Sequence, residues 1–185
     1  AHALMTQKGT LLEMGEAAVR GAFEDATIFR PSAMFGRDDA FLNALRGIVR
    51  RAPVIPLFGS GATRLQPVCV DDVAEAAARV VSAPQCAEPL YELGGPDVLT
   101  YRELLELLMR QEHRRPLLLS VPFMLWDILA AVAGLLPRPP LTEGQVALMK
   151  RDNIAAPDLP GLADLGISAT PLSAVLQEKA GARNR

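Results

Sequence analysis

Histidine and cysteine are scarce in this sequence of 185 residues, and each shortage limits the kind of site that the chain can form. The two cysteines, Cys69 and Cys86, lack CxxC spacing, which excludes a disulfide scaffold and a zinc module. Neither histidine, His2 or His113, has a nucleophile and an orienting partner beside it in the sequence, so neither is a candidate general base. The net charge is −2, which gives no overall field that favours nucleic acid.

Long apolar runs are also missing. The longest, residues 121–137, contains Asp127 and is shorter than the ~20 residues of a membrane-spanning helix, so we expect no transmembrane segment. The chain begins at Ala1 with neither an initiator methionine nor a signal peptide, and we therefore expect a fragment or a processed piece. Half of the residues are hydrophobic, which is enough for the core of one domain or of a small two-lobed one.

Helix-like and strand-like segments alternate along the chain, which is the pattern of an α/β fold. The predicted helices span residues 10–22, 41–51, 72–81, 100–111 and 123–136, with two more beginning at Thr142 and Thr170. The predicted strands span residues 26–29, 54–58, 65–70, 90–93 and 117–120. Capping pairs support four of the helix starts, namely Thr10 with Glu13, Asp72 with Glu75, Thr100 with Glu103 and Thr142 with Gln145.

Several residues resemble parts of a site, but local structure explains each of them. The glycine run at 59–63 has neither the Walker nor the dinucleotide spacing and precedes a strand, so it predicts a turn between two strands. Asp71 and Asp72 lack a third ligand, and capping accounts for Asp72, so we predict no metal site. Cys69 is expected to be an inert core residue, and His113 to lie at a solvated helix end. These residues alone define no self-sufficient active site.

The apolar segment around Trp126 has two interpretations. It packs within a small lobe, or it forms a docking surface for a membrane or a partner helix, because almost every face of the helix is apolar.

Several segments, taken in order, resemble parts of the extended and atypical short-chain dehydrogenases/reductases. They are RPSAMFG at 30–36, DAFLN at 39–43 with the turn at 56–63, QPVCVDDVA at 66–74, and YELGGP at 91–96. As a set they most resemble the Rossmann-type accessory subunit of respiratory complex I and its bacterial relatives, over nearly the whole chain from Gly15 onward.

The resemblance implies an α/β fold that forms the C-terminal part of an NAD(P)-binding, Rossmann-like domain. The N-terminal βαβ half, with its glycine-rich loop, is missing from the chain. Residues 1–35 and 71–95 are then the remnant of the Rossmann-like sheet and helices. Residues 36–70 and 96–185 form a small substrate-type or docking lobe. We expect NAD or NADP in a complete parent, and no tight binding of either by this chain alone.

The catalytic pair that the resemblance implies is absent. The family has a tyrosine, and a lysine four residues later that lowers its pKa, just before the equivalent of Gly15. Those positions hold Lys8 and Leu12. Residues 1–14 are also unlike the family, which favours a shifted reading frame or an internal start upstream.

A second departure separates this chain from the nucleotide-sugar epimerases. They resemble this region but place a phosphate-binding arginine seven residues before the aspartate that matches Asp72. That position holds Leu65, and Arg64, one residue earlier, turns to the opposite face of a strand unless a bulge intervenes. The difference favours the respiratory relatives.

The resemblance also suggests where a cofactor would lie in a complete parent. It places Arg30, Pro31, Ser32 and Met34 beside the nicotinamide end of the cofactor, and Gln66 in the substrate cleft. The alternatives are a strand end closed by a proline and an ordinary polar strand residue.

We therefore predict a non-catalytic, NAD(P)-associated accessory protein of the complex I type. Its predicted partners are respiratory-chain subunits or a membrane surface, reached through Phe123–Leu136, and its exposed sheet edge favours self-association. Its expected location is the cytoplasm, the periphery of a bacterial inner membrane or the mitochondrial matrix side. The alternatives are an extended-family oxidoreductase or epimerase that lacks its own catalytic half, and a degraded gene product without function.

Overall fold

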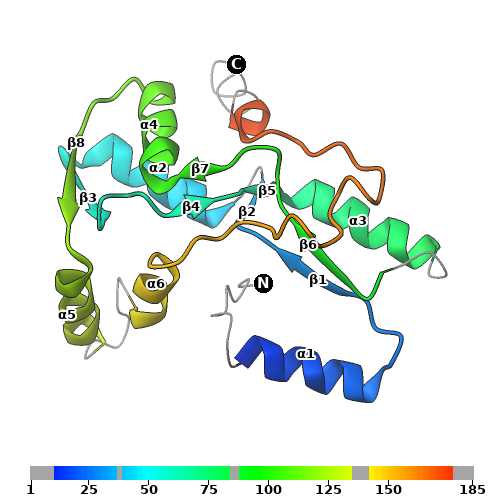
Figure 1. The fold of residues 1–185 in the computed structure, drawn as a ribbon. Coiled ribbons are helices and arrows are strands. Elements are labelled where there is room, and N and C mark those ends of the chain that lie inside the picture. The colour runs from blue at the N-terminus through cyan, green and yellow to red at the C-terminus, as the bar shows by residue number, and fades with distance from the viewer. Residues whose placement is uncertain (1–10, 37–38, 84–87, 135–141, 177–185) are drawn as a thin grey trace. The chain divides into compact units, whose positions relative to one another are not determined.

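The computed structural model describes residues 11–36, 39–83, 88–134 and 142–176 (Figure 1). The helices are α1 (Leu11–Ala22), α2 (Ala40–Arg51), α3 (Val70–Ser82), α4 (Tyr101–Gln111), α5 (Phe123–Ala133) and α6 (Glu143–Leu148). The strands are β1 (Ile28–Pro31), β2 (Met34–Phe35), β3 (Val54–Phe58), β4 (Arg64–Leu65), β5 (Val68–Cys69), β6 (Leu90–Leu93), β7 (Leu99–Thr100) and β8 (Leu117–Val121).

The chain divides into two compact units. Unit 1 comprises residues 1–37, 66–98 and 153–185, and unit 2 comprises residues 38–65 and 99–152. These bounds differ from the expected domains chiefly at residues 66–70 and 153–185, which belong to unit 1. The difference has a physical cause, because residues 153–170 make hydrogen bonds to side chains of β6, α3 and the β4–β5 junction.

Unit 1 is built on two parallel strand pairs, β1 with β6 and β2 with β5. Backbone hydrogen bonds continue the pairing past the strand ends, from Ser32 N–H to the Leu93 carbonyl (2.9 Å) and from Val68 N–H to the Ala33 carbonyl (3.0 Å). Helix α3 contributes the fully buried Ala76 to the core. The other buried members of that core are Val68, Tyr91, Leu93, Leu162 and Ile167.

Unit 2 pairs β3 with β8 in parallel and β4 with β7 in antiparallel orientation. Along β3 the side chains alternate, with Ile55 and Leu57 buried and Val54 exposed. Trp126 of α5 packs on this strand: its Nε1–H donates to the Leu57 carbonyl (3.0 Å), and its ring centroid lies 4.4 Å from that of Phe58. Packing within a lobe therefore accounts for Trp126, and other side chains of α5 remain exposed.

Several predictions that rest on neighbouring residues are confirmed. Both capping boxes in unit 2 form, Thr100 with Glu103 at α4 and Thr142 with Gln145 at α6. Strands β3 and β6 have the predicted bounds. The run at 59–63 joins β3 to β4, with Gly59 and Gly61 at positive φ, as a turn requires.

Three local predictions are wrong. Strand β1 includes Arg30 and Pro31 rather than ending before them. The predicted strand 65–70 is two short strands with different partners, separated at Gln66 and Pro67. Helix α3 starts earlier than predicted and has Cys69, not Asp72, as its N-cap. The Thr10 cap and residues 135–136 of the predicted 123–136 helix lie outside the described residues.

Candidate functional site

The five predicted site residues all belong to unit 1 and lie at the ends of its parallel strands or just outside them. Arg30 and Pro31 are the last residues of β1, Ser32 comes directly after them, and Met34 is the first residue of β2. Gln66 stands just before β5, whose partner β2 contains Met34. Because β1 and β6 are parallel, the ends of both strands meet at one edge, where Ser32 bonds to Leu93. This edge is where open α/β sheets bind ligands.

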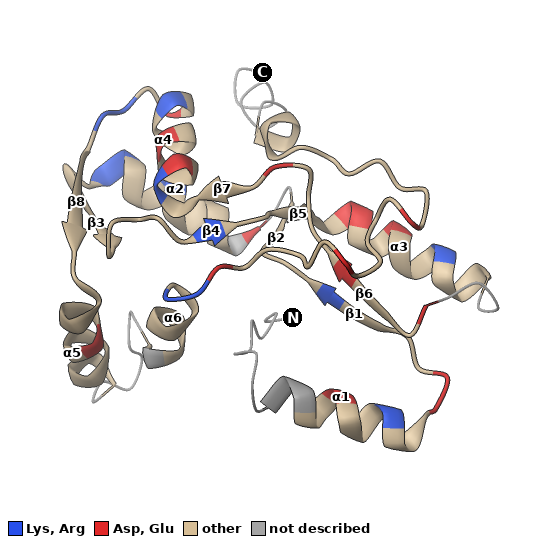
Figure 2. Ribbon diagram, viewed as in Figure 1, with Lys and Arg blue, Asp and Glu red and all other residues tan. Residues whose placement is uncertain are grey.

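Arg30 is held by two carboxylates. Its Nε and Nη2 atoms donate to both oxygens of Glu16 in α1 (2.8 and 2.7 Å), and its Nη1 donates to Glu92 of β6 (3.3 Å). The bidentate hydrogen bond from Arg30 lowers the pKa of the Glu16 carboxyl. The same bond raises the pKa of Arg30 further above its ordinary value. Arg30 therefore joins α1 to the β1–β6 pair. In Figure 2 the basic part of β1, in blue, lies beside the acidic part of β6, in red.

Ser32 and Gln66 hold a segment that we call the strap, residues 153–156. The Ser32 hydroxyl and the Gln66 backbone N–H both donate to the Asn153 carbonyl (2.9 and 3.0 Å). The Gln66 side chain accepts from Ala155 N–H and donates to the Gly95 carbonyl, each at 2.9 Å. Both polar ends of this amide are thereby satisfied within the protein.

Two glycines allow this close approach at the end of β6. A Cβ on Gly94 would lie 2.4 Å from the Gln66 side chain, and a Cβ on Gly95 would lie 1.8 Å from the Pro67 carbonyl oxygen. The second distance is shorter than any contact between non-bonded atoms, and the oxygen atom that the Cβ would meet belongs to the backbone. Glycine at position 95 is therefore a steric requirement of the site.

The other predicted residues lie in the core of unit 1 or beside it. Met34 is partly buried and packs against the unit 1 core, and Pro31 ends β1 where the chain leaves the strand. The side chains of Ser32 and Glu92 are each only 6% exposed. The roles predicted for Arg30, Pro31, Ser32, Met34 and Gln66 toward a cofactor or substrate stay predictions.

Asp72 has a different role from the predicted one. Its buried carboxylate accepts from the Thr170 backbone N–H (2.7 Å) and from the Thr170 hydroxyl (2.8 Å), so it fixes the segment after the strap to α3. Asp71 beside it is exposed. Within the described ranges, no group of three His, Cys, Asp or Glu side chains is arranged to hold a metal ion.

Arg64 and Leu65 lie on opposite faces of β4, as the strand geometry predicts. Leu65 is buried, whereas Arg64 is exposed and pairs with Asp152 in the same unit (2.8 Å). The hydrogen bond from the Arg64 backbone N–H, together with the bond from the Arg64 side chain, lowers the pKa of Asp152. The β4–β7 register is regular through both residues, without a bulge that would turn Arg64 to the other face.

Sequence reasoning missed Glu92 and the strap. Glu92 is an acidic residue within an apolar strand, LYEL, and that position was a usable signal because a buried carboxylate needs partners. Its Oε2 accepts from Ala156 N–H (2.7 Å), so Glu92 links Arg30 to the strap. The strap itself has no comparable signal, because it acts through backbone groups.

No family model matches the sequence, but relatives with described roles do. The chain is 35% identical over 161 residues to the mitochondrial NADH dehydrogenase (ubiquinone) 1 alpha subcomplex subunit 9 of Rattus norvegicus, which covers 86% of the chain and 42% of that protein. The chain is a homologue of this subunit. The Arabidopsis thaliana subunit 9 is 39% identical over 117 residues, covering 63% of the chain and 29% of the plant protein. The chain thus spans less than half the length of these subunit 9 relatives.

Solved structures show the fold. The protein gox2253 matches 89% of the chain with a TM-score of 0.58 and 19% identity, over 51% of its own chain. The UDP-glucose 4-epimerase of Thermotoga maritima, solved with UDP-glucose, matches 91% with a TM-score of 0.54 and 16% identity, over 50% of its own chain. MoeE5, solved with UDP-glucose and NAD, matches 84% with a TM-score of 0.51 and 16% identity, over 46% of its own chain. The chain has a Rossmann-like α/β fold of the extended short-chain dehydrogenase type, corresponding to about half of these structures.

Proposed function

We propose that this chain is the C-terminal part of a non-catalytic, NAD(P)-associated accessory protein of respiratory complex I. The observation that carries the proposal is the 35% identity to subunit 9 over 86% of the chain. In this role the chain contributes binding surface rather than an acid–base pair, since the tyrosine and lysine of the family pattern are replaced by Lys8 and Leu12. The relatives named above are mitochondrial, and we extend a location at the respiratory membrane to this chain.

The β1 edge supports the proposal that a preceding Rossmann half completes the sheet. Within the described residues, β1 pairs only with β6. The N–H groups of Ile28 and Ser32 point to the β6 side, so alternation turns the N–H of Phe29 to the other edge. Pro31 is on that edge as well and has no N–H to leave unpaired. Parallel sheets are usually covered on both faces and extended at their edges, so this edge suits one more strand.

The cofactor in the proposed parent is NAD or NADP, bound mainly by the preceding half. The edge at Ser32 and Gln66 would then lie beside its nicotinamide end. Protein groups already bind the side chains of Ser32, Gln66 and Arg30. This fits residues that shape the wall of the cofactor pocket better than residues that bind the cofactor directly. Titration of the chain alone with NADH, followed by fluorescence, is expected to give no tight binding. A tight complex would favour the oxidoreductase alternative.

Helix α5 supports a protein partner in unit 2. Its exposed large apolar side chains are Met124, Leu125, Ile128, Leu129 and Val132. The polar groups of the helix are satisfied, because Asp127 pairs with Lys150 (2.7 Å) and Trp126 bonds to Leu57. An apolar patch of this kind marks an interaction site on a protein surface. We assign it to a respiratory-chain subunit. No helix within the described ranges has the length and hydrophobicity to cross a membrane.

Affinity capture tests the proposal. The tagged chain is incubated with detergent-solubilised respiratory membranes, and recovered subunits of NADH dehydrogenase are quantified against the native chain. Ile128→Glu is expected to reduce recovery at least about tenfold, because it places a charge in the apolar contact. Val81→Glu, at an exposed apolar position of α3, is the matched control and is expected to leave recovery unchanged. Recovery of no NADH dehydrogenase subunit would contradict the proposal.

A further inference from the structure

A surface pocket in unit 2 collects cationic side chains around the end of α4. Its volume is about 490 Å³, and it is lined by Glu106, Met109, Arg110, His113, Arg114 and Arg115. Glu106, Met109 and Arg110 recur at three- and four-residue spacing, which places them on one face of the helix, and His113 follows the end of α4. The opposite face, with Leu104, Leu105 and Leu108, is buried in the core. The lining residues are thus directed away from the core.

The charge of this pocket is strongly positive. Three arginines line it against a single acidic residue, Glu106. The neighbouring Glu112 is not part of the lining, because its carboxylate binds Arg50 of α2 through two hydrogen bonds (2.6 and 2.7 Å). Figure 2 shows the basic segment between α4 and β8. Across the described residues, none of the three lining arginines has a side-chain hydrogen bond or ion pair, so their donors face solvent.

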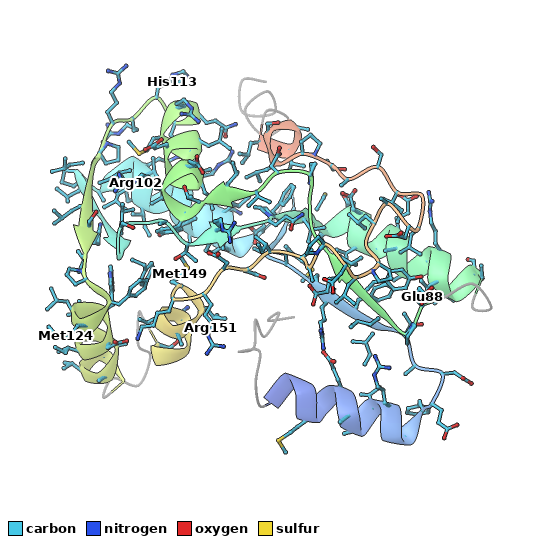
Figure 3. The ribbon with its side chains drawn as sticks, in the orientation of Figure 1. Glu88, Arg102, His113, Met124, Met149 and Arg151 are labelled. Carbon is cyan, nitrogen blue, oxygen red and sulfur yellow. The ribbon has the colours of Figure 1, made fainter. Side chains whose placement is uncertain are left out.

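The backbone at His113 brings the cations together. His113 has φ 51°, and it is the one non-glycine residue at positive φ within the described residues. Arg114 N–H donates to the Met109 carbonyl (3.0 Å) and His113 N–H to the Arg110 carbonyl (3.3 Å), the pattern of a Schellman motif. Glycine usually occupies this position, since it adopts the left-handed conformation without steric cost. A histidine here gives up backbone stability and adds an imidazole to the pocket (Figure 3).

We propose that this pocket binds a phosphate group. Guanidinium groups match phosphate oxygens with paired, charge-assisted hydrogen bonds, and three of them with free donors surround one cavity. Strained backbone is found where function maintains it, and here it lies within the cluster that would hold the anion. The phosphate belongs to a soluble anion or to a lipid headgroup, whose chemistry at this pocket is the same. The inference is independent of the function proposed above.

Calorimetric titration of the 185-residue chain with inorganic pyrophosphate tests the site. The Arg114→Ala/Arg115→Ala variant is expected to bind at least about tenfold more weakly, because it loses charge-assisted hydrogen bonds. Arg151→Ala is the matched control: it removes an exposed arginine of the same unit that lies near α6, away from His113 (Figure 3), and is expected to bind as the native chain does. Co-sedimentation with phosphatidylcholine vesicles, with and without phosphatidic acid, distinguishes a headgroup from a soluble phosphate.

The variant His113→Gly separates function from strain. Its midpoint of thermal unfolding is expected to stay the same or to rise by about 1–2 °C, and its phosphate binding is expected to weaken several-fold. A lowered midpoint, or phosphate binding equal to that of the native chain, would overturn the role of His113. The site as a whole is overturned if neither pyrophosphate nor phosphatidic acid vesicles bind, or if the double arginine variant binds as tightly as the native chain.

Discussion

Arg30 connects two carboxylates from distant parts of the chain, and one of them is almost fully buried. Glu92 is 6% exposed, so removal of its cationic partner leaves a buried charge with less compensation. Arg30→Met preserves most of the side-chain volume and removes these bonds. We expect it to lower the free energy of unfolding by roughly 1–3 kcal/mol, measured by urea denaturation.

The control is Arg110→Met. Arg110 is an exposed arginine of α4 without a side-chain hydrogen bond or ion pair among the described residues, so its replacement costs little. A loss of less than about 0.5 kcal/mol is expected for this control. Equal losses in the two variants would contradict the structural role of Arg30.

The same ion pair predicts a pH dependence. Arg30 lowers the pKa of Glu16 below its ordinary value of 4.5, so the pair stabilises the folded chain above that value. This contribution is lost as the pH falls from about 5 through the lowered pKa of the folded state. Urea midpoints between pH 7 and 3 should therefore fall more steeply for the native chain than for Arg30→Met. Parallel curves would contradict the pairing.

Asp72 and Asp71 are adjacent carboxylates in the first turn of α3 with different surroundings. Asp72→Asn replaces an oxygen that accepts from Thr170 with an amide that donates, whereas exposed Asp71 has no such bond in the described part of the chain. Both substitutions remove one negative charge from the same helix terminus, so their dipole effects match. We expect Asp72→Asn to destabilise by roughly 1–3 kcal/mol and Asp71→Asn by much less, with faster amide exchange at Thr170 in the first variant only.

What the sequence reveals about a residue depends on how far away its partners lie. The proposed site residues could be located near the ends of parallel strands because a resemblance of short segments placed them there. Their contacts could not be predicted, since Ser32 and Gln66 bind carbonyl and N–H groups of residues about 90 to 120 positions away. Asp72 shows the same limit: an aspartate at a helix start predicts a cap, and only the fold brings Thr170 to it.

At the scale of the elements, the capping pairs at the starts of α4 and α6 form as predicted, whereas the pair Asp72 and Glu75 does not cap α3. The capping boxes of α4 and α6 involve residues three positions apart, so nothing distant decides them. The segment 65–70 failed because partners decide where a short strand begins and ends. Strand β4 pairs with β7 in unit 2 and β5 with β2 in unit 1, and neither pairing has a local signal.

The end of β6 offers a steric test of the strap arrangement. Gly95→Ala would force a Cβ against the Pro67 carbonyl, so the β5 and β6 ends must separate. We expect a loss of roughly 2–4 kcal/mol, together with easier proteolysis of the strap. Gly21→Ala in α1 is the control, because its Cβ meets nothing within 4 Å, and it should stabilise by up to about 1 kcal/mol. Near-native stability of Gly95→Ala would show that the close approach is absent in solution.

For the whole molecule, the division into two units follows from contacts between distant segments. Unit 1 collects three stretches of the chain, and unit 2 collects two. From the resemblance we expected the first two stretches of unit 1 to alternate along the chain with the stretches of unit 2. The resemblance did not suggest the return of residues 153–185, because that return depends on the buried carboxylates Glu92 and Asp72 accepting bonds from it. Hydrogen bonds between residues so far apart in the chain leave no periodic pattern that sequence analysis detects.

The unpaired edge of β1 tests whether a preceding half belongs to the same sheet. In the chain alone, the Phe29 amide has no strand partner among the described residues, so its hydrogen exchange should be fast, while the amide of Ser32, bonded to Leu93, is protected. Supplying the preceding Rossmann half in the same polypeptide should slow exchange at Phe29 at least about a hundredfold and leave Ser32 little changed, because only the outer edge gains a partner. If Phe29 exchanges equally fast in both proteins, the preceding half does not extend the sheet at β1, and the proposed parent architecture fails even where the homology to subunit 9 holds.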